Sequence, residues 1–221
     1  MTQQRAIKTR AAVIAAAAHE FAARGYAGAS INSILAHSRS TKGALYFHFP
    51  SKEALAEAIL EDVRSAYSLI VERRHSADLH PFDTITGIVD DIAAVVTGVS
   101  GRAEMKLAID PPSTELERPS HVWEVAIRDA AEKAERAGYL RPEFTAERFT
   151  NFLLTTLAGH RILADMMPAN SDRPDLRDHF ADTVQTLVTT AATQDSLHSR
   201  VESGERSTPG APGTNDQVSE R

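Results

Sequence analysis

Apolar residues recur at helical spacing along almost the whole chain, with polar residues and prolines between the periodic segments. No segment keeps the alternation of apolar and polar residues that a half-buried strand requires. The pattern therefore predicts an all-α fold. Nine helices are expected, at residues 5–24, 30–37, 41–47, 51–74, 83–99, 103–109, 120–137, 145–167 and 174–195.

Several helix ends have local causes in the sequence. Ser30, Thr41 and Ser51 each precede a helical run, where a hydroxyl group can cap the unpaired N–H groups of the first turn. Gly25 follows the first helix and can take the left-handed conformation of a C-terminal cap. Apolar residues almost cease after residue 198, so we expect residues 199–221 to be a disordered tail.

The composition is that of an ordinary globular protein, with 42% hydrophobic and 24% charged residues in a chain of 221. The absence of cysteine excludes disulfide scaffolds, thiolate zinc sites, iron–sulfur clusters and cysteine nucleophiles. The apolar run from Ala11 to Ala18 follows a basic N-terminus, but His19 and Glu20 end it too early for a signal peptide. No uncharged apolar run approaches the ~20 residues that span a bilayer. We therefore expect a cytoplasmic protein.

The net charge of -6 is unevenly distributed. Residues 1–55 contain seven Lys or Arg and two Glu, a balance of +5, so the remaining residues carry -11. A basic N-terminal part joined to an acidic remainder indicates that only the first part meets a polyanion.

Residues 30–47 have the pattern of two short helices joined by a tight turn at 38–40. Leu45 of the second helix is expected to pack against Ile34 of the first and against Phe21. This is the arrangement of a helix-turn-helix unit, whose second helix presents its N-terminal residues to the bases of DNA.

The residue types in the second helix agree with a DNA-binding role. Thr41 and Lys42 lie at its partially positive N-terminus, and small Gly43 lets the helix enter the major groove. Tyr46 lies one turn beyond Lys42, within reach of a phosphate or a thymine methyl, although its ring can equally pack in the core. His48 and Lys52 flank the end of the helix as further phosphate ligands. Each residue alone fits an ordinary surface, but together, within a basic segment, they favour DNA binding.

The stretch from Arg10 to Leu60, and above all the run TKGALYFHFPSKEALA, resembles the N-terminal domain of TetR-family transcriptional regulators. It is most similar to the γ-butyrolactone receptor subgroup of actinobacteria. The resemblance implies a homodimer that represses transcription from a pseudo-palindromic operator and controls secondary metabolism. It also implies that a γ-butyrolactone, butenolide or furan-type signalling molecule releases the DNA. With the start of the first helix included, the expected DNA contacts are Lys8, Thr9, Arg10, Ser40, Thr41, Lys42, Gly43, Tyr46, His48 and Lys52.

The resemblance also divides the chain into domains. Residues 1–50 would form the DNA-binding domain, residues 51–198 the ligand-binding and dimerisation domain, and residues 199–221 the tail. The helix at 51–74 would connect the first two, so a ligand that prefers one tilt of this helix would change the spacing of two recognition helices.

A ligand cavity is expected around the single tryptophan, Trp123, in the middle helices. Its wall would be apolar with a few hydroxyl groups, which suits a small, mainly apolar molecule with one or two acceptors. The expected wall residues are Ile85, Ile88, Val89, Met105, Trp123, Ile127, Phe152, Thr155 and Thr156. The alternative is that these residues are simply core. The resemblance implies that Trp123 packs on the lactone and that Thr155 or Thr156 supplies a hydroxyl. The chain departs from the subgroup at 61–64, which reads EDVR where a glutamine is common.

Two long helices, at 145–167 and 174–195, carry apolar stripes that predict a four-helix dimer interface. The stripes consist of Phe149, Phe152, Leu153, Thr156, Leu157, His160, Ala164 and Met167, and of Leu176, Phe180, Val184, Leu187, Val188 and Ala191. Gly159, in the middle of the first helix, would permit a close approach of two backbones. The alternative is that both stripes face the core of their own subunit.

Catalytic functions are not supported by any motif in the chain. The nucleophile elbow, dinucleotide-binding, phosphate-binding-loop and HExxH patterns are all absent. His75, Asp78 and His80 are expected to be solvated loop residues, and His160 an interface histidine, so neither a metal nor a cofactor is expected. Two other functions remain open: a repressor of the same fold that senses an antibiotic or other lipophilic molecule, and a DNA-binding protein without a ligand.

Overall fold

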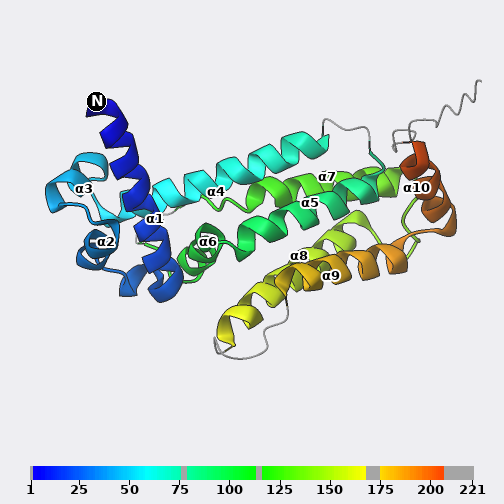
Figure 1. Ribbon diagram of the computed structural model, residues 1–221. Helices are drawn as coiled ribbons and strands as arrows, with labels where there is room; N and C mark the ends of the chain where they lie inside the picture. The colour runs from blue at the N-terminus through cyan, green and yellow to red at the C-terminus, as the bar shows by residue number, and fades with distance from the viewer. Residues whose placement is uncertain (1, 76–78, 113–115, 168–174, 207–221) are drawn as a thin grey trace, which may run out of the picture.

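The computed structural model describes residues 2–75, 79–112, 116–167 and 175–206. These residues form ten helices and no strand, which confirms the all-α prediction (Figure 1). The helices are α1 (Thr2–Gly28), α2 (Ile31–Ser38), α3 (Lys42–His48), α4 (Lys52–His75), α5 (Pro81–Thr97), α6 (Val99–Ile109), α7 (His121–Arg136), α8 (Ala146–Met166), α9 (Leu176–Ala191) and α10 (Gln194–Arg206). None of them is long and apolar enough to cross a membrane.

The helix count exceeds the nine expected because the chain bends after Ala191 and starts α10. The hydroxyl of Thr193 accepts a hydrogen bond from the backbone N–H of Ser196 in the first turn of α10. Arg200 of α10 pairs with Asp83 of α5. The prediction of a disordered tail from residue 199 is therefore wrong for residues 199–206, while residues 207–221 lie outside the described part of the chain.

Hydroxyl caps start the helices where the sequence predicts them. The side chains of Ser30, Thr41 and Ser51 accept hydrogen bonds from the backbone N–H three residues later, at 3.1–3.2 Å. The end of α1 differs from expectation: Gly25 has φ 68° and ψ -175°, so α1 kinks there and continues to Gly28. Glycine is required at this kink because other residues rarely adopt that conformation.

The molecule is elongated, with α1–α3 at one end and the long helices α4, α5, α7, α8 and α9 extending from them (Figure 1). It contains two apolar cores. The first lies among α1, α2, α3 and the start of α4, and the second among α4, α5, α7, α8 and α9. The first core extends beyond residue 50 to Leu60, so the start of α4 packs with the first three helices.

Helix α6 is shared between the two ends of the molecule. Its residues Ala103 and Leu107 belong to the first core, with α1 and α2. At its C-terminal end, the carboxylate of Asp110 accepts a hydrogen bond of 2.7 Å from the backbone N–H of Ala27, just after the kink in α1. Apolar packing and this hydrogen bond therefore both link α6 to α1.

Candidate functional site

Helices α2 and α3 form the helix-turn-helix unit that the sequence predicts. Ile34 and Leu45 are fully buried in one core with Phe21. The turn depends on Arg39, the one non-glycine residue in the described chain with a positive φ (51°). Its backbone N–H bonds to the carbonyl of Leu35, which ends α2 and redirects the chain into α3.

The outer face of α3 is open and carries the expected side chains. Thr41, Lys42 and Gly43 are exposed, and a Cβ atom added to Gly43 would meet no atom within 4 Å. The ring of Tyr46 is 42% exposed, so it lies outside the core, and the Lys42 ammonium stands 6.0 Å from its centre. This face combines a low backbone profile, a cation and a phenol group, which suits contact with a DNA groove.

Phe47 is a second exposed aromatic residue on α3, and it was not among the residues expected to contact DNA. Its side chain is 81% exposed and packs edge-on against His48, with ring centres 5.1 Å apart. Leu45 and Phe49 lie four residues apart and are both buried, so the two residues that follow Leu45 face outward. The sequence contains this spacing and could have indicated the exposure of Phe47. An exposed apolar ring beside Tyr46 can pack against thymine methyl groups.

The other residues expected to contact DNA, at the start of α1 and in the turn before α3, differ in their exposure and contacts. Lys8 and Arg10 on α1 are exposed, Thr9 is half-buried, and the Arg10 guanidinium lies 5.4 Å from the centre of the Phe49 ring. Ser40 is half-buried in the turn, where its hydroxyl donates to the carbonyl of Ser38.

Lys52 has a structural role besides the phosphate contact expected of it. Its ammonium donates to the carbonyls of Tyr26 (2.8 Å) and Ala29 (3.1 Å) and lies 4.2 Å from the centre of the Tyr26 ring. Only one of its three N–H donors is left for a phosphate. The main role of Lys52 is to join the start of α4 to the end of α1.

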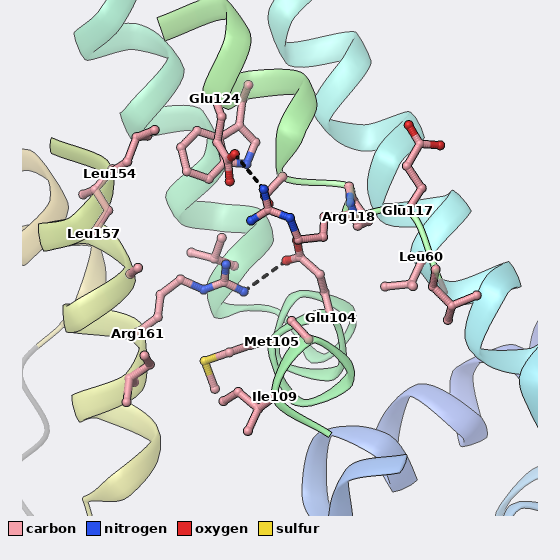
Figure 2. A pocket seen from close by; sticks show the side chains of 18 of the residues that line it. Leu60, Glu104, Met105, Ile109, Glu117, Arg118, Glu124, Leu154, Leu157 and Arg161 are labelled. Atoms are coloured by element: carbon pink, nitrogen blue, oxygen red, sulfur yellow. Dashed lines mark hydrogen bonds and ion pairs between the residues drawn. The ribbon is translucent and has the colours of Figure 1, made fainter. Parts of the chain in front are cut away.

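A separate cavity of about 240 Å³ lies among α4, α6, α7 and α8, beside the segment 116–120 (Figure 2). Its wall is mostly apolar. The lining residues include Leu60, Val96, Met105, Ala108, Ile109, Leu116, Pro119, Trp123, Leu154, Leu157, Ala158, Ile162 and Phe180, with Glu104, Glu117, Arg118, Ser120, Glu124 and Arg161 as the polar members.

Of the nine expected wall residues, Met105 and Trp123 line this cavity. Four others lie deeper: Ile85, Ile88, Val89 and Ile127 are fully buried in the second core, as in the alternative that the sequence left open. They support the wall without lining it.

Three expected wall residues on α8 are not part of the cavity wall, which corrects their placement beside Trp123. Phe152 is 58% exposed, Thr155 is exposed, and the Thr156 hydroxyl donates to the carbonyl of Phe152. The physical reason is the helical period, because α8 presents Leu154, Leu157, Ala158 and Arg161 to the cavity.

The cavity wall contains a buried polar network that joins three helices. Oε2 of Glu104 (α6) accepts hydrogen bonds of 3.0 Å from the Tyr67 hydroxyl (α4) and from Arg161 (α8). The same nitrogen of Arg161 donates to the carbonyl of Gly101 at 2.9 Å. Burial and the neighbouring carboxylate of Glu104 raise the pKa of Tyr67 above its usual range, so its hydroxyl remains a donor.

Trp123 contributes both a ring and an unused donor to this region. Its ring lies edge-on to that of Tyr67, with centres 6.3 Å apart, and its indole N–H is buried without a hydrogen-bond partner. A buried donor without a partner is costly, and an acceptor atom of a ligand would remove that cost.

Outside the cavity, α8 carries an exposed apolar face that is unusual for a protein surface. Phe152, Leu163 and Met166 are between 58% and 75% exposed, and Ile162, which also lines the cavity, is 44% exposed. A groove between α8 and α9 adjoins it, where His160 stacks on His179 with ring centres 4.9 Å apart and contacts the Thr183 hydroxyl at 3.0 Å.

The stripes predicted for a dimer interface point mostly inward. Phe149, Leu153 and Leu157 of α8 are buried in the second core, together with most of the α9 stripe: Phe180, Val184, Leu187, Val188 and Ala191. For these residues the alternative is correct: they face the core of their own subunit. Because one face of α8 is used for the core, a different face of the helix is exposed.

The histidines near the end of α4 lie in different surroundings. His75 contacts the carbonyl of Val71 at 3.1 Å, and Asp78 lies outside the described residues. His80 is only 9% exposed, stacks on Tyr139 and accepts from the N–H of Phe82, so the prediction that it is solvated is wrong. Across the described ranges, no three His, Asp or Glu residues are grouped to hold a metal.

Comparisons with known proteins agree with this geometry. Residues 13–59 match the model of the family described as bacterial regulatory proteins, tetR family. The chain is 29% identical to the A-factor receptor protein of Streptomyces griseus over 180 residues, which are 81% of this chain but only 62% of that receptor.

Two solved structures match most of the chain. One is a γ-butyrolactone receptor described as ArpA-like, with a TM-score of 0.71 and 27% identity over 91% of this chain and 97% of that one. The other is CprB from Streptomyces coelicolor in complex with its operator sequence, with a TM-score of 0.60 and 28% identity over 81% and 97% of the two chains. By its N-terminal domain the chain therefore matches the bacterial regulatory proteins of the tetR family, and over most of its length it has the fold of solved TetR-family regulators.

Proposed function

We propose that the protein is a cytoplasmic, ligand-responsive repressor that binds a pseudo-palindromic operator as a homodimer. A small γ-butyrolactone, butenolide or furan-type signalling molecule releases it and so controls secondary metabolism. The observation that carries the proposal is that one chain holds an exposed recognition helix and a separate apolar cavity, and that α6 both lines the cavity and shares the first core with α1–α3. The similarity to the A-factor receptor and to γ-butyrolactone receptors supports this ligand class.

The DNA-binding domain in this proposal is residues 1–50, with the first part of α4 completing its core. Helix α3 enters the major groove with Thr41, Lys42, Gly43 and Tyr46 toward the bases and phosphates. Ser40, His48, Lys52 and the start of α1, with Lys8, Thr9 and Arg10, contact the flanking backbone. Phe47 joins this surface as an apolar contact.

The ligand domain acts on DNA binding by a shift between two states. A ligand in the cavity contacts α6 through Met105 and α7 through Trp123, while α6 also packs against α1. Half-sites lie about 34–36 Å apart, so a change of a few ångströms between two recognition helices weakens binding. The ligand drives this shift only to the extent that it prefers the released state.

The dimer in this proposal forms through the exposed face of α8. The large apolar side chains there are costly in water, and a second copy would cover them. A two-fold operator requires a two-fold protein, which is why a dimer fits the helix-turn-helix unit.

A leucine at Gly159 tests this interface. A Cβ atom at Gly159 meets nothing within 4 Å in the single chain, and leucine favours helix over glycine by about 1 kcal/mol, so the subunit should remain folded. At the interface the larger side chain would separate the helices. We expect Gly159→Leu to weaken dimerisation by roughly tenfold or more, measured by sedimentation equilibrium. Lys133→Leu, on the exposed face of α7, is the matched control and should stay dimeric.

The proposed function as a whole is tested by a gel shift with DNA from the gene's own promoter region. The protein should prefer an inverted repeat in that DNA over random sequence, and γ-butyrolactones should release it. Release by an antibiotic, with no response to the lactones, would instead favour the drug-sensing function. Tight binding that no small molecule changes would favour a repressor without a ligand.

A further inference from the structure

Glu104 is a buried carboxylate that a purely apolar ligand cavity would not require. It is 5% exposed and lies on α6 in the cavity wall. Burial of a charged group is unfavourable unless hydrogen-bond partners compensate for it. The partners of the Glu104 carboxylate therefore need to be identified.

The partners of Glu104 occupy only one of its two oxygens. Tyr67 and Arg161 both donate to Oε2, and no other residue in the described part of the chain bonds to the carboxylate. Figure 2 shows Arg161 extending from α8 toward Glu104 across the cavity. Oε1 therefore remains as an acceptor, held in a fixed position by the two bonds to its neighbour.

The charges around the cavity are already paired. Arg161 faces Glu104, Arg118 lies 3.5 Å from Glu124, and Arg64 lies 3.2 Å from Glu117. A ligand with a net charge would have to enter among these pairs without a free partner, so the wall favours a neutral molecule.

A carboxylate accepts hydrogen bonds and cannot donate them, whereas the free indole N–H of Trp123 can only donate. A neutral ligand that complements both must carry a hydroxyl group for Glu104 and an oxygen acceptor for Trp123. We propose that Glu104 is a specificity-determining residue, which selects a hydroxyl-bearing neutral ligand through its Oε1 atom. The proposal rests on the function proposed above and names the group that the ligand must present to α6.

The test compares γ-butyrolactones that differ only in a hydroxyl group. The probes are a series with the hydroxyl at successive carbons of one alkyl side chain, and the analogue with no hydroxyl on that chain. Titration calorimetry on the full-length protein should show that the best hydroxylated member binds roughly tenfold to a hundredfold more tightly than the analogue, because the analogue leaves Oε1 unpaired. In Glu104→Gln this preference should fall by roughly tenfold, because an uncharged amide bonds the hydroxyl group less strongly than a carboxylate does. Glu132→Gln, which breaks a surface pair with Arg136, should keep the wild-type preference.

Each remaining outcome decides the question. If Glu104→Gln unfolds because the Arg161 charge is left unpaired, Glu104→Gln/Arg161→Gln removes that charge and should show the same loss of preference. An equal preference in wild type and variant overturns the role of Glu104 but leaves the proposed function intact. An amino analogue that binds more tightly than the hydroxyl one overturns the requirement for a neutral ligand. Failure of every lactone to bind wild type overturns the proposed function, and the role of Glu104 with it.

Discussion

Gly43→Leu is expected to lower operator affinity by about a thousandfold, to the level of non-specific DNA binding, while the protein remains fully folded. Gly43 is exposed on α3, and a Cβ atom there meets no protein atom within 4 Å. Glycine also disfavours helix by about 1 kcal/mol relative to other residues, so the free energy of unfolding should stay equal or rise. The loss would arise at the groove, where the leucine side chain would hold the helix away from the bases.

Fluorescence anisotropy with a labelled operator measures the affinity, and thermal unfolding measures the stability. Lys133→Leu adds the same side chain to an exposed position on α7 and should bind the operator as wild type does. Unchanged operator affinity in Gly43→Leu would show that α3 does not enter the groove by this face.

Trp123→Ala is expected to keep operator binding and to lose ligand-induced release. Trp123 lines the cavity, and its indole N–H is the buried donor that a ligand acceptor would satisfy. The residue also packs against Tyr67, so the truncation should lower the free energy of unfolding by about 3 kcal/mol. Trp123→Phe is the sharper variant, because it keeps an aromatic ring and removes the N–H. It should need roughly tenfold more lactone for release.

The measurement is the lactone concentration that releases half of the bound operator. Ile88→Val controls for stability, because Ile88 is fully buried behind the cavity and its truncation should cost about 1 kcal/mol without changing release. Our assignment of the cavity is wrong if Trp123→Ala releases DNA at the wild-type lactone concentration.

The helix-turn-helix unit is the part of the site that sequence reasoning predicts most fully. The hydroxyl groups of Ser30 and Thr41 cap N–H groups only three residues later, and the helical period alone predicts a buried Ile34 and an open Gly43. A pattern of such short range can be recognised from the order of residues alone. The exception is Lys52, whose two carbonyl partners lie in a segment more than twenty residues away.

The cavity is predicted much less well, because its wall is assembled from helices far apart in the chain. Periodicity identifies Ile85 and Ile127 as apolar but cannot say whether they line a cavity or lie behind it. The charged groups Glu104 and Arg161 are separated by 57 positions and meet only when α6 packs against α8. No spacing in the sequence predicts that Glu104 and Arg161 form a pair.

The sequence by itself determined the helical fold, the helix-turn-helix unit and the division of charge between the two parts of the chain. These follow from helical periodicity, capping and composition, which act locally or as simple sums. Only the tertiary structure decided which apolar faces meet one another, because a helix with apolar residues on several sides can bury any of them. It thereby placed Phe152 outside, joined α6 to both cores and brought Tyr67, Glu104 and Arg161 together at the cavity wall.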